Sequence, residues 1–275
     1  MILDWKIPAQ KIYSELKNEI QQKNLKIKWV VVLVWNNINS LRYIKNKLKN
    51  AKEIWADLSV MHLDEKITTN ELLKKIELLN EDIDVNWIIV QLPLPKHIDE
   101  KKVIYSIKPK KDIDGFHIQN LWKLVIWDDN WLWSCTPLWI IELFRYYNID
   151  LVWKNIVIVW RSNIVWKPIA NLLINKSATV TICNSKTKNI EFYTKNADIV
   201  ITAMWCPWFL TLDKINNQTV VIDVWFSVIN WKIYWDADFE NIEKNWNMIT
   251  PVPWWVWALT VAFLMKNLFY AFNNK

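Results

Sequence analysis

Glycine is almost absent from this chain, which contains 1 glycine and 22 tryptophans among 275 residues. An ordinary soluble domain contains roughly 7% glycine, or about 19 residues in a chain of this length. Together the two counts come close to that number. We infer that most tryptophans stand where the protein has glycine, as results when a gene that uses UGA as a glycine codon is translated with UGA as tryptophan. The alternative is a chain that is truly rich in tryptophan.

The positions of the tryptophans agree with this hypothesis, because many of them occur where turns and helix ends are expected. Such sites often have positive φ, which glycine adopts freely and a bulky residue does not. Some tryptophans, such as Trp133, can still be genuine. The residues that end an apolar run or a helical pattern, flank a short strand or follow a proline are Trp35, Trp55, Trp231, Trp235, Trp254 and Trp255.

Cysteine, long apolar runs and clustered charge are also scarce, and each absence excludes a class of protein. The three cysteines are widely spaced and the three histidines are scattered, so neither a disulfide framework nor a metal site is expected. No apolar stretch approaches the 18 residues of a membrane helix, and the first residues lack a signal-peptide pattern. We therefore expect a cytoplasmic protein with no membrane partner.

The net charge of +6 is spread along the chain. A nucleic-acid surface would instead concentrate its basic residues on one face. We therefore expect no nucleic-acid partner, and an anionic small molecule fits this charge better.

Short apolar runs alternate with helical patterns, which indicates βαβ units and parallel sheets. Helices are expected at 7–20, from a cap at Ser40 to about 54, from Thr68 or Thr69 to about 79, at 136–147, after Pro168 and at 258–272, with a loop at 108–117. The two βαβ series divide near residue 137. The runs that predict buried strands are 29–35, 58–63, 87–92, 156–159, 178–183, 198–202 and 219–224.

The stretch from Ile156 to Pro168 has the order strand, tight turn, helix, which is where a doubly wound α/β fold binds a dinucleotide. The turn must bring backbone N–H groups against phosphate, and this requires glycine. Trp160 and Trp166 stand at the glycine positions. Genuine tryptophans there would fill the pyrophosphate site and favour an inactive binding protein.

Residues near this turn favour a phosphorylated dinucleotide. A NAD site places an acidic side chain at the end of the second strand. Here that strand ends at Cys183, and residues 184–187 contain no Asp or Glu. Because a guanidinium suits a phosphate group, we expect Arg161 and Ser185 to hold the 2′-phosphate of NADP. Alternatively, Arg161 is a solvated turn residue.

Four polar positions in the first half are site candidates, although each has an ordinary structural alternative. Tyr43 and Lys47 are four residues apart on one helical face, as surface pairs often are. Gln91 ends a parallel strand, where open α/β sheets bind ligands, but it can equally cap a loop. Asp112 and Asp114 flank the single glycine, an arrangement that also suits an Asx turn.

With glycine in place of tryptophan, a longer series of motifs resembles the methylenetetrahydrofolate dehydrogenase/cyclohydrolase family over essentially the whole chain. The series is Tyr43-x-x-x-Lys47, Gln91-Leu-Pro-Leu-Pro95, Lys111-Asp-Ile-Asp-Gly-Phe-His117, Cys135-Thr-Pro137, Trp160-Arg-Ser-x-x-Val-Trp166-x-Pro168 and Pro251-Val-Pro-Trp-Trp-Val-Trp257-x-x-Thr260.

The resemblance implies a two-domain α/β fold. The expected parts are an N-terminal catalytic domain at 1–136, a Rossmann-type NADP-binding domain at 137–257, and a C-terminal helix within 258–275 that packs back on the first domain. It further implies a homodimer that pairs through the Rossmann domain.

The implied function is a bifunctional enzyme of one-carbon metabolism and purine biosynthesis. It would oxidise 5,10-methylenetetrahydrofolate with NADP⁺ and hydrolyse the methenyl product to 10-formyltetrahydrofolate. By this resemblance Lys47 is the catalytic lysine, Gln91 supports it, Tyr43 stacks on the folate and Asp114 hydrogen-bonds the pterin. The implied cofactor residues are Trp160, Arg161, Ser162, Trp166, Ser185 and Thr202, and the further substrate residues are Pro253, Trp254 and Thr260.

Three alternatives remain: a dehydrogenase without hydrolase activity, an inactive folate- or nucleotide-binding protein, and another two-domain dehydrogenase that acts on amino or hydroxy acids. Lys47 with Gln91 argues against the first, and the set of Tyr43, Lys47 and Asp114 argues against the last. Residues that depart from the family pattern are expected to affect folate affinity more than reaction type. They are Leu41, where glutamine is common, and Ser134 and Ala258, where proline is usual.

Overall fold

The structure is a computed structural model, and it describes residues 1–25, 27–35, 37–128, 134–160, 162–163, 165–224, 226–229, 232–251 and 262–267. In space the chain divides into two compact units. The first unit comprises Ala9–Cys135 with Thr260–Lys275, and the second comprises Met1–Pro8 with Thr136–Leu259. The domain boundaries given above stay predictions, because a spatial division does not establish which segments fold together.

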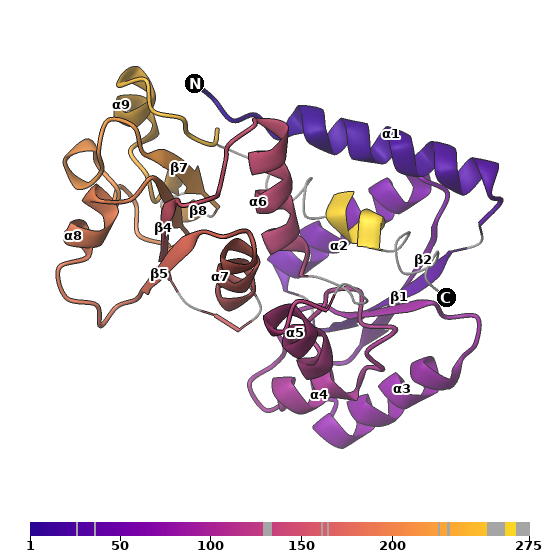
Figure 1. The fold of residues 1–275 in the computed structure, drawn as a ribbon. Coiled ribbons are helices and arrows are strands. Elements are labelled where there is room, and N and C mark those ends of the chain that lie inside the picture. Colours follow the sequence, from indigo (N-terminus) through magenta and orange to yellow (C-terminus); the bar gives the residue numbers. More distant parts are fainter. Residues whose placement is uncertain are drawn as a thin grey trace. The chain divides into compact units, whose positions relative to one another are not determined.

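A three-stranded parallel sheet lies at the centre of the first unit (Figure 1). Its middle strand, β1 (Lys28–Val34), pairs with β2 (Asp57–Leu63) on one side and with β3 (Trp87–Val90) on the other. Strands β1 and β3 are buried almost throughout, which is why they occur as continuous apolar runs. The helices are α1 (Lys6–Gln22, whose first three residues belong to the second unit), α2 (Ile38–Glu53), α3 (Thr69–Glu81), α4 (Glu100–Ser106) and α5 (Ile118–Val125).

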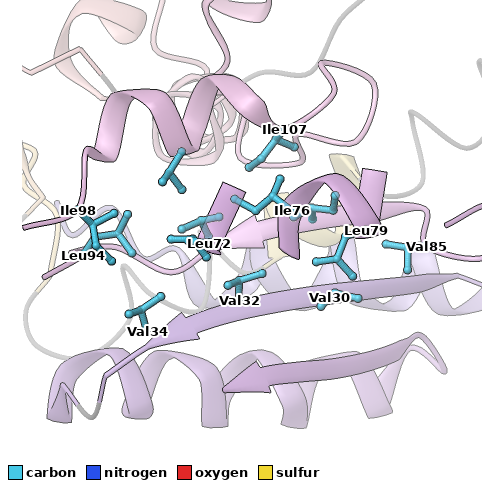
Figure 2. Packing of buried hydrophobic residues seen from close by; sticks show 13 residues of the cluster. Val30, Val32, Val34, Leu72, Ile76, Leu79, Val85, Leu94, Ile98 and Ile107 are labelled. Carbon is cyan, nitrogen blue, oxygen red and sulfur yellow. The ribbon is translucent and has the colours of Figure 1, made fainter. Parts of the chain in front are cut away.

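One face of β1 carries a core cluster of the first unit. Val30, Val32 and Val34 alternate along the strand and lie against the apolar stripe of α3, which includes Leu72 and Ile76 (Figure 2). A strand with period 2 thus meets a helix with period 3.6, and all five side chains are buried. Each contributes about 1.5–3 kcal/mol of apolar burial, so this cluster fixes α3 on the sheet.

The starts of two helices test the predicted caps. Helix α3 has the expected cap at Thr68, whose Oγ1 accepts from the Glu71 N–H at 3.3 Å while the Glu71 carboxylate accepts from the Thr68 N–H at 2.8 Å. Helix α2 begins earlier than predicted, at Ile38. Asn37 Oδ1 accepts from the Ser40 N–H at 3.1 Å. The cap at Ser40 was therefore wrong, because Asn37 precedes it and already satisfies that donor.

The second unit contains a four-stranded parallel sheet with the order β5-β4-β6-β7. The order reverses between β4 and β6, and this switch point is where doubly wound sheets bind ligands. Strands β4 to β7 confirm the four strands predicted for this part of the chain to within two residues. The bounds of all described elements of this unit follow. They are β4 (Asn155–Val159), β5 (Thr179–Cys183), β6 (Ile199–Thr202), β7 (Val220–Asp223), the antiparallel β8 (Phe226–Ile229) and β9 (Lys232–Trp235), α6 (Cys135–Tyr146), α7 (Trp166–Asn175), the 3₁₀ turn Leu212–Lys214, α8 (Ile190–Lys195) and α9 (Phe239–Lys244).

Several elements differ from the prediction. The short helices α4, α5, α8 and α9 and the strand β8 were not predicted. Helix α7 begins at Trp166, with Pro168 in its first turn, where proline is tolerated. Of the C-terminal helix, residues 262–267 are described and are helical. They belong to the first unit, which confirms that this helix returns to it. Among the described residues, no helix is long and apolar enough to cross a bilayer.

Many described tryptophans occupy conformations that favour glycine. A bulky residue with positive φ costs about 1–2 kcal/mol. Trp235 is an exception to the expected turn sites, because it lies within β9. Trp133, Trp231, Trp254 and Trp255 lie outside the described residues. The tryptophans with positive φ are Trp35, Trp55, Trp127, Trp153, Trp160, Trp205, Trp208 and Trp246.

Buried tryptophans carry a second cost. Within the described part of the chain, the Nε1 atoms of Trp5, Trp29 and Trp139 are buried and have no hydrogen-bond partner. An unpaired buried N–H costs about 1–3 kcal/mol. Glycine would incur neither this cost nor the cost of positive φ. Both observations support glycine at these positions, and the recoding hypothesis stays a prediction.

Candidate functional site

Lys47 is buried in the first unit, with 8% of its surface exposed. Its Nζ donates to Gln91 Oε1 at 3.1 Å. Gln91 directly follows β3, and its Nε2 donates to the Leu92 carbonyl at 2.9 Å, which turns the amide oxygen toward Lys47. The fold therefore brings together two of the predicted site residues, from a helix and from the carboxyl end of a strand.

Burial shifts the pKa values of the charged groups in this site. Loss of water lowers the pKa of Lys47, while Asp114 and Cys135 act in the opposite direction and raise it. Burial likewise raises the pKa of Asp114, and Lys47 lowers it. Lys47 and Asp114 thus belong to one buried electrostatic cluster. A lysine whose pKa is lowered in this way can act as a base nearer neutral pH than a solvated one.

Tyr43 lies one helical turn before Lys47 on α2 and is half-buried. Burial raises the pKa of its phenol, so the hydroxyl stays neutral over the physiological range. A neutral phenol offers a flat apolar ring with one polar tip. Tyr43 therefore suits contact with a planar ligand beside Lys47.

The loop before α5 presents Asp114 and is held by Asp112. Asp112 Oδ2 accepts from the His117 N–H at 2.7 Å and from Asn120 Nδ2 at 2.9 Å. Burial raises the pKa of Asp112 to about 6. Gly115 closes the turn with φ 70°, a region that favours glycine. Asp112 is thus the turn-forming carboxylate of the pair, and Asp114 is the one coupled to Lys47.

Two further groups of this cluster were not predicted. Asn267 Nδ2 lies 3.5 Å from Cys135 Sγ and 3.4 Å from the Ile113 carbonyl. Burial raises the pKa of Cys135, which keeps the thiol neutral. The sequence feature that could have indicated Asn267 is its position on the buried side of an apolar helical pattern, one turn after Phe263 and Leu264.

In the second unit, the turn after β4 carries the first cofactor candidates. The Trp160 N–H donates to the Cys183 carbonyl at 2.9 Å, and its φ of 141° suits glycine. Ser162 Oγ accepts from the Val165 N–H at 3.2 Å, at the start of α7. Trp166 is buried. Arg161 lies outside the described residues.

The end of β5 carries the next candidates. Asn184 and Thr187 close a tight turn, in which the Asn184 N–H donates to Thr187 Oγ1 at 2.9 Å. Ser185 and Lys186 are exposed at its tip. With an exposed hydroxyl and ammonium and no carboxylate, the turn fits a phosphorylated ribose. Thr202, at the end of β6, is fully buried.

The loop after β6 is fixed at the same carboxyl edge of the second sheet. Asp236 accepts from the backbone N–H groups of Met204, of Trp205 at 3.2 Å and of Cys206 at 2.7 Å. A strand-turn-helix, an acid-free β5 turn and an anchored β6 loop therefore line one edge. These residues fit a phosphorylated dinucleotide, and Trp160 fits it when read as glycine.

The remaining predicted site residues, Pro253, Trp254 and Thr260, lie outside the described residues. An open pocket of about 490 Å³ follows β1 and β2 in the first unit and is lined by none of the predicted site residues. Its tryptophan, Trp35, donates from Nε1 to the Pro93 carbonyl at 3.2 Å. The lining residues are Trp35, His62, Leu63, Asp64, Glu65 and Lys66.

Known proteins share both parts of this chain. A family model described as tetrahydrofolate dehydrogenase/cyclohydrolase, catalytic domain, matches residues 3–114, and one described as the NAD(P)-binding domain of the same family matches residues 134–275. The bifunctional protein FolD of Hydrogenobaculum sp. (strain Y04AAS1) is 43% identical, with 100% of this chain and 99% of that protein covered.

Two crystal structures extend this similarity to the fold. The bifunctional enzyme FolD from Campylobacter jejuni is 39% identical, with a TM-score of 0.96 over 100% of this chain and 99% of that one. FolD from Trypanosoma brucei, complexed with NADP cofactor and inhibitor, is 29% identical, with a TM-score of 0.93 over 99% and 97% of the two chains.

Proposed function

We propose, because this chain belongs to the tetrahydrofolate dehydrogenase/cyclohydrolase family, that it is a bifunctional enzyme of folate metabolism. It oxidises 5,10-methylenetetrahydrofolate to the 5,10-methenyl cation with NADP⁺ and hydrolyses that cation to 10-formyltetrahydrofolate. The observation that carries the proposal is the hydrogen bond between the buried Lys47 and the half-buried Gln91, with Lys47 coupled electrostatically to Asp114, in the part that matches the catalytic domain.

For the oxidation, the residues of this chain mainly bind and orient. NADP⁺, when bound, would supply the acceptor for a hydride from the methylene carbon. Ser162 lies before the start of α7 and Ser185 follows β5, both at the carboxyl edge of the second sheet, and this position supports a role in holding the phosphate groups. We assign the 2′-phosphate to Arg161 and Ser185. Alignment of two reactants is worth many orders of magnitude in rate. Because hydride transfer moves no proton, we assign no acid or base to this step.

For the hydrolysis, Lys47 acts as the base. Its neutral amine takes a proton from the attacking water as the oxygen bonds to the methenyl carbon. The hydroxyl of the adduct then loses its proton to solvent and becomes the formyl C=O, while the C–N5 bond breaks and N5 takes the proton from Lys47. The formyl group stays on N10 and the lysine is neutral again. Gln91 Oε1 accepts one N–H of Lys47, which aims the nitrogen lone pair. Because the base must be neutral, the rate of hydrolysis rises as the pH rises through the pKa of Lys47.

The substrate is held by two further residues of the first unit. Tyr43 supplies a flat ring for the pterin and aminobenzoyl groups. Asp114 accepts hydrogen bonds from the N–H edge of the aminopterin, a geometry that suits a carboxylate. Its charge also favours the cationic methenyl intermediate. Pro253, Trp254 and Thr260 complete the folate site in this proposal.

The test uses the protein expressed with glycine at the tryptophan positions discussed above. Reduction of NADP⁺ in the presence of 5,10-methylenetetrahydrofolate is followed by absorbance, and decay of methenyltetrahydrofolate is followed separately. Both activities are expected. If saturating substrate produced no NADPH, the chain would instead be an inactive binding homologue.

The variant Lys47→Met separates the bifunctional enzyme from a dehydrogenase without hydrolase activity. Loss of a general base costs about 10²–10⁴-fold, so we expect hydrolysis to fall by at least a hundredfold while NADP⁺ affinity stays unchanged. Full hydrolase activity in this variant would remove Lys47 from the mechanism.

We further propose a cytoplasmic homodimer that pairs through its cofactor domain and supplies one-carbon units for purine biosynthesis, without nucleic-acid or membrane partners. Three free cysteines, Cys135, Cys183 and Cys206, support a reducing compartment. Sedimentation of the purified protein measures its mass in solution, and a monomer at micromolar concentration would contradict the dimer.

A further inference from the structure

The side chain of Asn267 joins the C-terminal helical segment, residues 262–267, to the Lys47 cluster. It is 6% exposed although it is polar, and it lies on the buried side of a segment in which Lys266 is exposed and the other residues are apolar. Its Nδ2 approaches two acceptors, the Ile113 carbonyl at 3.4 Å and Cys135 Sγ at 3.5 Å. The two acceptors belong to different segments that meet only in the folded first unit.

Both acceptors lie next to the groups that set the charge of Lys47. Ile113 immediately precedes Asp114, so a bond to its carbonyl fixes the backbone from which the Asp114 carboxylate projects. Cys135 interacts electrostatically with Lys47, Asp114 and Asp112. The Cys135 Sγ also lies 4.0 Å from the Ile113 carbonyl. One amide therefore sits against both segments that border Lys47.

We propose that Asn267 is a positioning residue of the hydrolase site: its amide ties the Ile113 carbonyl to the Cys135 thiol and thereby holds Asp114 at Lys47. This inference rests on the proposed function for its kinetic consequence. The titratable groups that face one another here are Lys47, Asp112, Asp114 and Cys135. Release of Asp114 removes a group that raises the pKa of Lys47, so the acid limb of the hydrolysis profile moves to lower pH.

The variant Asn267→Leu keeps the volume and removes the donor. We expect kcat for methenyltetrahydrofolate hydrolysis to fall at least tenfold, the acid limb to move to lower pH, and NADP⁺ affinity to stay within twofold of the wild-type value. If this variant is insoluble, Asn267→Ser is measured instead, because its hydroxyl is too short to reach both acceptors.

The matched control is Asn247→Leu. Asn247 is also a buried amide, and its Nδ2 donates to the Asn216 carbonyl at 3.0 Å and the Thr219 carbonyl at 2.9 Å, within the second unit. We expect this variant to lower stability without moving the hydrolysis profile. An unchanged profile in Asn267→Leu, or an equal change in Asn247→Leu, would overturn the positioning role.

A second measurement does not depend on activity. The rate of Cys135 alkylation, resolved from Cys183 and Cys206 by peptide mass analysis, reports whether the thiol stays in place. We expect alkylation to speed up at least tenfold in Asn267→Leu and to stay unchanged in Asn247→Leu. An inactive wild-type protein would contradict the proposed function alone, whereas unchanged Cys135 alkylation would contradict the positioning role.

Discussion

At the scale of single residues, the orientation of the Gln91 amide determines which of its atoms faces the Lys47 ammonium. The Nε2 group is occupied by the Leu92 carbonyl, so an oxygen faces the Lys47 ammonium. That oxygen is a neutral acceptor and leaves the charge of Lys47 to burial and to Asp114. Whether this position carries glutamine or glutamate therefore affects the pKa of Lys47 and so its protonation state.

Gln91→Glu places a carboxylate at this position, 3.1 Å from Lys47 Nζ in the present geometry. An opposite charge at this distance favours the ammonium form and raises the pKa of Lys47. We expect the acid limb of methenyltetrahydrofolate hydrolysis to move to higher pH by about one unit or more. Stopped-flow hydrolysis rates between pH 6 and 10 measure it, and a shift to lower pH would contradict the assignment of Lys47 as the base.

Trp153 and Trp246 test the conformational cost of tryptophan at glycine sites. Their φ angles are 63° and 67°, and they are 89% and 88% exposed, so little packing is lost when they are shortened. We expect Trp153→Gly and Trp246→Gly each to raise the free energy of unfolding by about 1–2 kcal/mol, measured by urea denaturation.

Trp122 is the control for this comparison. It is 61% exposed but lies inside α5, where φ is helical. Because glycine is a poorer helix former than tryptophan, Trp122→Gly should instead destabilise by about 0.5 kcal/mol. Equal effects at all three sites would show that exposure, and not φ, determines the response.

At the scale of elements, the turn before α5 depends on the protonation of Asp112. Its pKa of about 6 in the folded protein lies above the usual 3.8. The contribution of Asp112 to the free energy of unfolding is therefore fully present below about pH 4. It falls between pH 4 and 6, because Asp112 ionises at lower pH in the unfolded chain than in the folded protein. Above about pH 6 the contribution no longer changes. The fall amounts to roughly 3 kcal/mol.

Asp112→Asn removes this titration and keeps an oxygen that can accept from the His117 N–H and from Asn120. We expect the difference in unfolding free energy, wild type minus variant, to decrease between pH 4 and 6. Urea unfolding at several pH values measures it. A difference that increases over this range would mean that Asp112 is ionised and stabilised in the folded turn.

The sequence predicted the strands well because parallel strands buried on both faces are continuous apolar runs, as β3 and β4 are. Helices α4 and α5 were missed for a local reason. They are 7 and 8 residues long, too short to show a helical period, and α5 is capped by His117, which is an unusual cap residue.

The candidate site was predictable only in part. Lys47 and Gln91 were found through a family pattern, because nothing in their spacing of 44 residues indicates a contact. Asn267 was missed because a buried amide has no meaning until its acceptors are known. Asp112 and Asp114 could not be distinguished from the sequence, since their different roles arise from which of them meets the His117 N–H.

At the scale of the whole molecule, the recoding hypothesis has a simple consequence for the purified native protein. Each tryptophan that is truly glycine removes one indole, so both the mass and the absorbance at 280 nm should fall below the values for 33.2 kDa and 22 tryptophans. Intact mass spectrometry of protein from its own cells measures the first. A native mass that matches the printed chain would reject the hypothesis.

The chain crosses between the two units after Pro8, after Cys135 and after Leu259. During synthesis on a ribosome, Lys47 and Gln91 emerge early, whereas Asn267 emerges after the whole second unit. The segment that carries Lys47 therefore waits, with the contacts of Asn267 unmade, until more than a hundred later residues have been added. The contacts of Asn267 with the buried charge cluster can therefore form only after the segment Thr136–Leu259 of the second unit has been synthesised.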